Sequence, residues 1–124
     1  MSKPIFEGKN IFVQIHESEI PWLKIFTKKQ IKEFSDCDFE TKNEIMTALD
    51  IIEKEMISYY DPTKINIASF GNYLPHLHFH IMARFDDDSY FPEPMWGKKM
   101  RESECHLGDF DTFLHNIVTK LQLA

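Results

Sequence analysis

The amino-acid sequence predicts an α+β domain with a mostly antiparallel sheet. Two observations support this class. Short segments rich in β-branched and aromatic residues follow one another in hairpin-like pairs, and two longer segments have apolar residues at helical spacing. The length of 124 residues, of which 43% are hydrophobic and 14% aromatic, fits one domain over residues 1–124 and argues against disorder.

Four segments are predicted to form strands. They are residues 10–15, 22–27, 64–70 and 76–85. The first two are joined by a polar stretch that ends at Pro21, which predicts a hairpin. The third alternates between polar and apolar residues and ends at Gly71-Asn72, a turn signal. The fourth also alternates, so that every second side chain is expected on the same face of the sheet.

Two helices are predicted, at about residues 38–60 and 109–121. In both segments apolar residues recur every three or four positions and would form one buried stripe. Asp38 and Asp109 are the expected N-caps, and Asp61-Pro62 should end the first helix.

Three of the six histidines lie within five residues, at His76, His78 and His80. Side chains alternate along a strand, so these imidazoles are expected on one face. The opposite, apolar face would consist of Leu77, Phe79 and Ile81. If that face packs on the long helix, the imidazoles stand on a surface that is free to meet a ligand.

Three kinds of chemistry could use such a row. A metal site is one, but residues i and i+4 on a strand lie about 13 Å apart, which is too far to converge easily on one ion. A structural or pH-sensing cluster is the second. The third is phosphoryl chemistry, in which one neutral imidazole attacks phosphorus while its neighbours donate hydrogen bonds or a proton. The residues alone leave all three open.

The segment from His76 to Met82 fits the signature His-φ-His-φ-His-φ-φ, where φ is apolar, of the histidine triad (HIT) family of nucleotide hydrolases and transferases. The flanking features also resemble a HIT domain over about residues 5–97. They are the hairpin at Pro21-Trp22, Lys28-Lys29 after its second strand, the long helix, Gly71-Asn72 and Arg84. Pro94-Met95-Trp96-Gly97 resembles a little-characterised bacterial subgroup of HIT-like proteins.

The resemblance implies a HIT-like fold with a mostly antiparallel sheet of about five strands. It also implies that His78 attacks the α-phosphorus of a nucleotide and forms a covalent nucleotidyl-histidine, which water then hydrolyses. His80 would donate a hydrogen bond to a phosphate oxygen, and His76 would orient His78 through its backbone carbonyl. The third histidine stands where the uridylyltransferase branch has glutamine, so in this position the chain resembles the hydrolases.

Three further residues are implied to bind substrate. Asn72 and Tyr73 belong to the loop on the phosphate side, and Glu17 falls near an acidic position that contacts the ribose hydroxyls. Two positions depart from the family pattern. Trp22 stands where many family hydrolases have a fourth histidine, and Tyr73 stands where they have a Ser or Thr that helps the leaving group depart. A nucleotide-binding module with weak or no turnover is therefore the alternative to a hydrolase.

The implied substrate is a nucleoside phosphoramidate or a dinucleoside polyphosphate, with a purine base, and the implied partner is a second copy in a homodimer. No cofactor or metal is required, although Mg²⁺ can accompany a polyphosphate. Asp86–Asp88 could hold such an ion, but a solvated turn is the favoured interpretation.

Composition limits the other partners and the location. A net charge of −6 disfavours nucleic acid and anionic membranes as partners, and no apolar run approaches the roughly 18 residues of a membrane span. The first residues lack a signal peptide, and Cys37 and Cys105 lack Cys-x-x-Cys spacing, so a cytoplasmic location is predicted. Residues 62–85 contain no Asp or Glu, and Lys64 and Arg84 make this stretch favourable for an anionic ligand.

Several residues keep two interpretations. Lys28 and Lys29 could steer phosphate or be ordinary exposed lysines. Trp96 could stack on a base, join a dimer contact, or simply pack within Pro92–Gly97. Cys105 lacks an adjacent base, so a thiol nucleophile is not expected. The isolated histidines are interpreted as bystanders; they are His16, His106 and His115.

Overall fold

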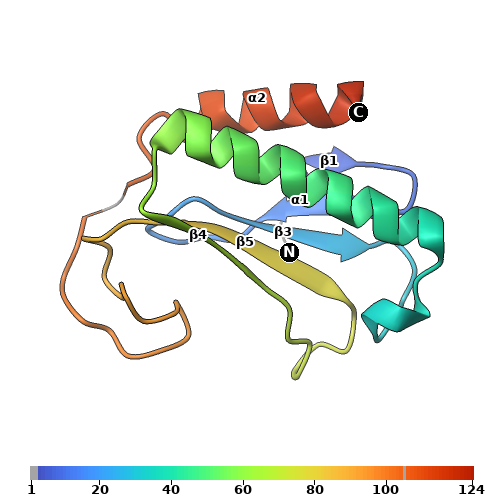
Figure 1. Cartoon of the computed structure of the whole chain (residues 1–124), viewed down its shortest axis with the longest axis horizontal. Helices are drawn as coiled ribbons and strands as arrows, with labels where there is room; N and C mark the ends of the chain where they lie inside the picture. The colour runs from blue at the N-terminus through green and yellow to red at the C-terminus, as the bar shows by residue number, and fades with distance from the viewer. Residues whose placement is uncertain (1–2, 105) are drawn as a thin grey trace.

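The computed structural model describes residues 3–104 and 106–124, in which a five-stranded sheet has two helices on one face (Figure 1). The strands are β1 (Phe6–Glu7), β2 (Ile11–Ile15), β3 (Trp22–Thr27), β4 (Lys64–Ala68) and β5 (His78–Arg84). Their order across the sheet is β1-β2-β3-β5-β4, and all neighbouring pairs are antiparallel. The predicted fold class is therefore confirmed. The order also places β3 directly beside the strand that contains His78 and His80.

The two long helices begin at the predicted caps. Helix α1 (Phe39–Tyr60) follows Asp38, whose carboxylate accepts the backbone N–H of Thr41 at 2.8 Å. It ends at Asp61, which has a left-handed φ of 47°. Helix α2 (Phe110–Leu123) follows Asp109, and a short 3-10 helix, η1, spans Phe34–Asp36. No helix within the described ranges is both long and apolar enough to cross a membrane.

The hydrophobic core lies between the helices and the sheet. Ile45, Ile52 and Met56 of α1 are buried there against Leu77 and Ile81, which come from the predicted apolar face of the histidine segment. Burying such a side chain contributes about 1.5–3 kcal/mol to folding. The packing on α1 therefore leaves the opposite face of β5 to its histidines.

Four strand boundaries differ from the prediction, and two of them, the start of β2 and the end of β5, differ by a single residue. β4 ends at Ala68, and β5 begins at His78, so His76 precedes the strand. The cause is a local change of partner: the Leu77 N–H donates to the carbonyl of Ile31, beyond the end of β3, at 2.7 Å. β1 has only two residues, which is too short for any period in the sequence to reveal it.

Candidate active site

Cross-strand pairing between β2, β3 and β5 places the histidines beside aromatic and basic side chains. Phe26 of β3 lies opposite His78, and their rings stack with centroids 4.7 Å apart and planes at 17°. Phe12 lies on the other side of Phe26, with centroids 5.2 Å apart. In the next row Lys24 lies opposite His80. The ring of His78 is therefore supported on one side by an aromatic stack.

The backbone determines the tautomer of His78. Its Nδ1 lies 2.8 Å from the carbonyl oxygen of His76, and because a carbonyl only accepts, Nδ1 must hold the proton. In the neutral ring the lone pair is then on Nε2. The Nε2 of His76 lies 2.6 Å from the carbonyl oxygen of Thr27 and is a donor for the same reason. The carbonyl of His76 thus makes the contact to His78 that the resemblance implies.

His80 has the opposite tautomer arrangement. The indole Nε1–H of Trp22 donates to its Nδ1 at 3.0 Å, and since an indole only donates, the neutral ring must hold its proton on Nε2. His80 is 7% exposed, and this burial is the largest cause of a shift that lowers its pKa to about 4. Neighbouring positive charge adds to the shift, from His78, His16 and Lys24. His80 is therefore neutral at physiological pH.

His16 is part of this arrangement, which corrects its interpretation from the sequence as a bystander. Its ring stacks on Trp22 with centroids 3.9 Å apart and meets the edge of His80 at 6.1 Å. Burial lowers the pKa of His16, and the charge of Lys24 adds to the effect. The other two isolated histidines lie elsewhere, since His106 stacks on Phe85 and His115 is exposed on α2.

A cavity of about 400 Å³ lies over His78 and His80. Residues 70–74 form one side, and Lys24, Phe26 and Trp96 complete its lining. Among the predicted substrate-binding residues, Asn72 and Tyr73 line this cavity, whereas Glu17 lines a separate hollow of about 150 Å³. A larger hollow of about 650 Å³ lies between β1, α1 and the end of α2, and no histidine lines it.

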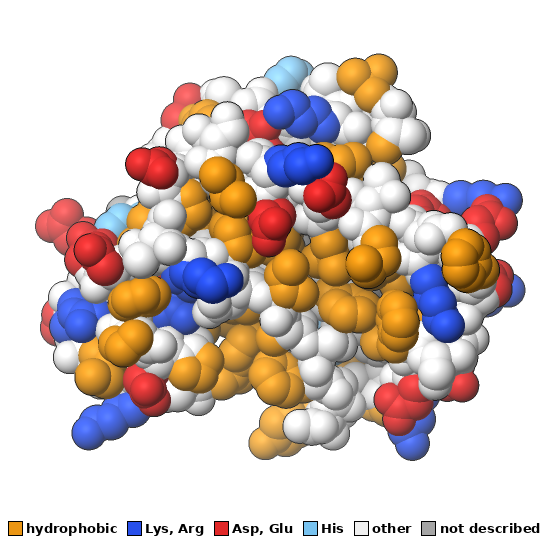
Figure 2. All heavy atoms as spheres, viewed as in Figure 1, with side chains coloured by type: hydrophobic (Ala, Val, Ile, Leu, Met, Phe, Trp, Pro, Cys, Tyr) orange, Lys and Arg blue, Asp and Glu red, His pale blue; other side chains and the backbone are white. Residues whose placement is uncertain are grey.

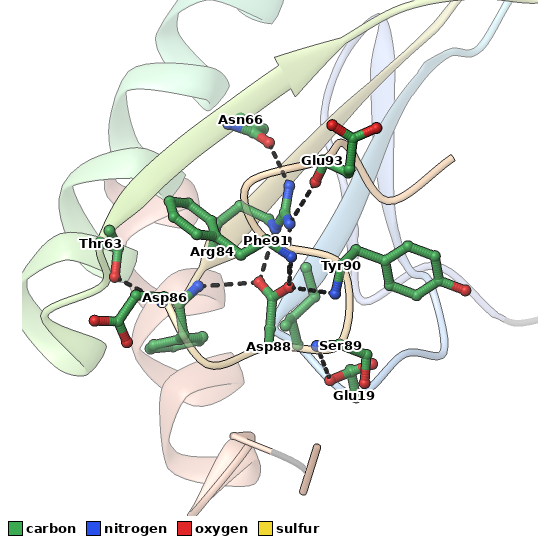
Figure 3. Close-up of polar contacts among 12 residues, drawn as sticks. Glu19, Thr63, Asn66, Arg84, Asp86, Asp88, Ser89, Tyr90, Phe91 and Glu93 are labelled. Atoms are coloured by element: carbon green, nitrogen blue, oxygen red, sulfur yellow. Dashed lines mark hydrogen bonds and ion pairs between the residues drawn. The ribbon is translucent and has the colours of Figure 1, made fainter. Parts of the chain in front are cut away.

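Asp88 is not part of a solvated turn, and the sequence interpretation of Asp86–Asp88 is wrong for this residue. Asp88 is 0% exposed and Arg84 1%, and two nitrogens of the Arg84 guanidinium donate to the carboxylate at 2.8 and 3.1 Å (Figure 3). The carboxylate also accepts backbone N–H groups from Phe85, Tyr90 and Phe91. Burial alone would raise the pKa of Asp88, but these hydrogen bonds outweigh it and lower the pKa to about 2.

This ion pair holds the loop that reaches the cavity. Arg84 also donates to the carbonyl of Glu93 at 2.7 Å, three residues before Trp96. The Trp96 ring lies 4.9 Å from His80 and 4.8 Å from Phe70, measured between centroids. The charge of Arg84 is thus neutralised within the protein rather than available to a ligand, contrary to the sequence expectation. Among the described residues, the cation that lines the cavity is Lys24, together with the aromatic side chains of Phe70 and Trp96.

Metal ligands and thiols are the two other kinds of reactive side chain to place in the structure. Among residues 3–104 and 106–124, no group of three or more His, Cys, Asp or Glu side chains is arranged to hold a metal ion. Cys37 is a buried free thiol, and burial raises its pKa. Cys105 lies outside the described residues. On this face the tautomers of His78 and His80 are complementary, because the first ring offers a lone pair and the second offers an N–H.

The chain is similar in fold to several solved proteins. A histidine triad protein from Bradyrhizobium japonicum is 25% identical, with a TM-score of 0.80 over 97% of this chain and 90% of that chain. Histidine triad proteins from Marinobacter aquaeolei (22% identical, TM-score 0.81, 97% and 90% covered) and Sinorhizobium meliloti (23%, 0.76, 95% and 88%) share the fold. No curated protein matches the chain. The HIT domain family model matches residues 7–87, and the chain belongs to the HIT family.

Proposed function

We propose that the protein is a nucleotide phosphohydrolase or nucleotidyl transferase that acts at the α-phosphate through a covalent nucleotidyl-histidine on His78. Membership of the HIT family supports a nucleotide-binding or hydrolase role. One observation supports the finer proposal. The ring centroids of His78 and His80 are 5.0 Å apart, and the first ring offers a lone pair on Nε2 while the second offers an Nε2–H. A nucleophile beside a neutral donor is the pair that phosphoryl transfer needs.

The proposed reaction has two steps. The Nε2 lone pair of His78 attacks the α-phosphorus, and the bonding electrons leave with the leaving group. Water then attacks the phosphorus of the nucleotidyl-histidine, and the bond between phosphorus and Nε2 breaks with its electron pair returning to His78. The water proton passes to solvent, and a nucleoside monophosphate is released. His80 donates from Nε2 to a phosphoryl oxygen on which negative charge develops. The carbonyl of His76 stabilises the positive charge that the His78 ring gains when its Nε2 is bonded to phosphorus.

The cavity suits a nucleotide in its other walls as well. Phe70 and Trp96 form an aromatic wall on which a purine base can stack. Asn72 and Tyr73 add polar groups at the rim that can reach phosphate oxygens. Glu17 lies outside the lining, so the ribose contact implied for it is not part of the proposal.

Turnover tests the proposal directly. The wild-type protein is expected to release AMP from adenosine phosphoramidate or from diadenosine tetraphosphate, and His78→Ala should lower the rate by about 10³-fold or more. Acid-quenched intact-mass spectrometry should detect one nucleotide on the wild-type protein and none on the variant. His115→Ala, which changes an exposed histidine on α2, is the matched control and should keep the wild-type rate. Wild-type rates no higher than those of His78→Ala would contradict the proposal for these substrates.

A nucleotide-binding module with weak or no turnover is the second candidate. The observation that favours it is Tyr73. Its side chain is fully exposed, and it stands where family hydrolases have a Ser or Thr that helps the leaving group depart. Calorimetry with AMP separates the candidates. Micromolar binding without turnover supports the module, and the absence of any AMP binding would contradict both candidates.

We also propose that the chain forms a homodimer that extends the sheet across β4. This strand is an edge of the sheet, with backbone groups available to a second chain. Ile67 of β4 and Ile57 of α1 are 47% and 49% exposed. Figure 2 shows hydrophobic side chains gathered across the middle of the face on which α1 and β4 lie in front. A second copy would cover this apolar surface.

A further inference from the structure

Lys24 is the only Lys, Arg, Asp or Glu among the described residues that line the cavity over the two histidines. It lies opposite His80 in the pairing of β3 with β5. Its Nζ is 5.7 Å from the centroid of the Phe26 ring, and that ring stacks on His78. The ammonium group therefore lies in the same cavity as both histidines that would face a substrate.

Lys24 has no anionic partner within the described part of the protein. No carboxylate there lies within 4.0 Å of its Nζ, whereas four other lysines each have such a partner. Those lysines are Lys9, Lys54, Lys99 and Lys120. Lys24 is also partly buried, and burial lowers its pKa. A partly buried cation without a counter-ion costs free energy, which an anion in the cavity would offset.

We propose that Lys24 binds the phosphate group beyond the α-phosphate, and that the site therefore prefers substrates whose leaving group is itself a phosphate over nucleoside phosphoramidates. This inference rests on the proposed function, because it assumes that the α-phosphorus lies at His78. Lys24 is then a residue that determines specificity by contact with the substrate.

The chemistry of the leaving group explains the preference. When the bond between Nε2 of His78 and the α-phosphorus forms, the bridging phosphorus–oxygen bond breaks and its electron pair leaves on the bridging oxygen. The leaving phosphate thereby gains negative charge beside Lys24, which stabilises it. A phosphoramidate breaks a phosphorus–nitrogen bond instead, and the departing nitrogen takes up a proton from water, so that it leaves as a neutral amine. That amine has no negative charge for Lys24 to stabilise.

Calorimetry with two nucleotides that differ by one phosphate tests this inference. The ligands are AMP and α,β-methylene-ADP, whose carbon bridge resists cleavage. The wild-type protein is expected to bind the diphosphate about 10- to 100-fold more tightly than AMP, as for a charge-assisted hydrogen bond. Lys24→Met should bring the ratio of the two affinities to about 1 and leave AMP affinity within about 3-fold of wild type. Lys24→Arg should retain most of the ratio, because the charge remains.

Lys28→Met is the matched control, since Lys28 follows the same strand but is exposed and lies outside the cavity lining. It should keep the wild-type ratio. Equal loss of both affinities in Lys24→Met, or an unchanged ratio, would overturn the inference and leave the proposed function intact. A wild-type protein that binds neither nucleotide would overturn both.

Turnover gives an independent measurement. The ratio of kcat/KM for diadenosine tetraphosphate to that for adenosine phosphoramidate should fall by about 10- to 100-fold in Lys24→Met. It should stay at the wild-type value in Lys28→Met. A ratio that Lys24→Met leaves unchanged would overturn the inference.

Discussion

Trp22 shows how one side chain determines the protonation of another. The family resemblance places a fourth histidine at this position in many hydrolases, and an imidazole there could donate or accept according to its own protonation. The indole of Trp22 can only donate, so it stabilises the neutral His80 ring with the proton on Nε2. The departure from the family pattern thus maintains a donor in the cavity over a wide pH range.

Trp22→Phe tests this dependence. The change removes the hydrogen bond that stabilises neutral His80, so the pKa of His80 should rise by about one unit, which corresponds to one net hydrogen bond. An NMR titration of the imidazole resonances measures the shift. Trp96→Phe is the control, because the Trp96 ring contacts His80 without a hydrogen bond to it. Equal pKa values for His80 in wild type and Trp22→Phe would contradict the assigned tautomer.

The depressed pKa of His80 also predicts how stability depends on pH. Between pH 6.5 and about 4 the unfolded chain binds a proton at His80 that the folded protein does not. The free energy of unfolding should therefore fall as the pH falls through this window, by up to about 3 kcal/mol from this residue. Urea denaturation at pH 7, 5.5 and 4 measures the change.

A matched pair of variants isolates the contribution of His80 to this pH dependence. His80→Gln should flatten the decrease between pH 6.5 and 4, because glutamine does not titrate. His115→Gln changes an exposed histidine and should keep the wild-type slope. If His80→Gln and wild type lose the same free energy between pH 7 and 4, the pKa assignment is wrong.

At the scale of elements, β5 links the site to the loop that follows it. The strand begins at His78 and ends at Arg84, whose guanidinium binds Asp88 in the loop. Asp88→Asn would leave the buried Arg84 charge without its carboxylate, which costs about 3–5 kcal/mol. Chemical denaturation should detect this loss, and AMP affinity should fall because the loop that holds Trp96 is loosened. Asp86→Asn, two residues earlier and exposed, should change neither quantity by more than about 0.5 kcal/mol.

Helices could be predicted from the sequence more closely than strands. Both caps and both starts agree with the prediction, because Asp38 and Asp109 act on backbone groups within their own first turn. The predicted start of β5 is two residues too early. The alternation of side chains already begins at His76, where the backbone is not yet paired as a strand. Asp88 looked solvated beside two other aspartates, and its burial depends on Arg84 and on how the loop folds back.

At the scale of the whole molecule, the dimer proposal predicts a change in mass. Ile67→Asp puts a charge on the apolar edge strand and should convert a dimer into a monomer in light scattering after size exclusion. Leu123→Asp is the control, because Leu123 is 82% exposed at the end of α2. A wild-type chain with monomer mass at micromolar concentration would contradict the proposal.

Sequence position also explains which part of the candidate site was missed. His76, His78 and His80 are visible as a motif because they lie on one short segment. The resemblance already marks the position of Trp22, but its hydrogen bond to His80 spans 58 positions. Lys24 is not singled out by any pattern in the sequence, and it lies opposite the same histidine only because β3 and β5 are neighbours. Strand order is a property of the folded sheet, so a single sequence contains no local signal for it.

The Arg84–Asp88 pair has a consequence for the rate at which a ligand binds. The pair ties the loop from Asp88 to Glu93 to the end of β5, close to Trp96. Ordering a loop costs conformational entropy of roughly 1–2 kcal/mol per residue, and here that entropy is lost when the chain folds. A nucleotide then meets a Trp96 side chain whose loop is already ordered, so its association rate should be limited by diffusion into the cavity and not by closure of this loop.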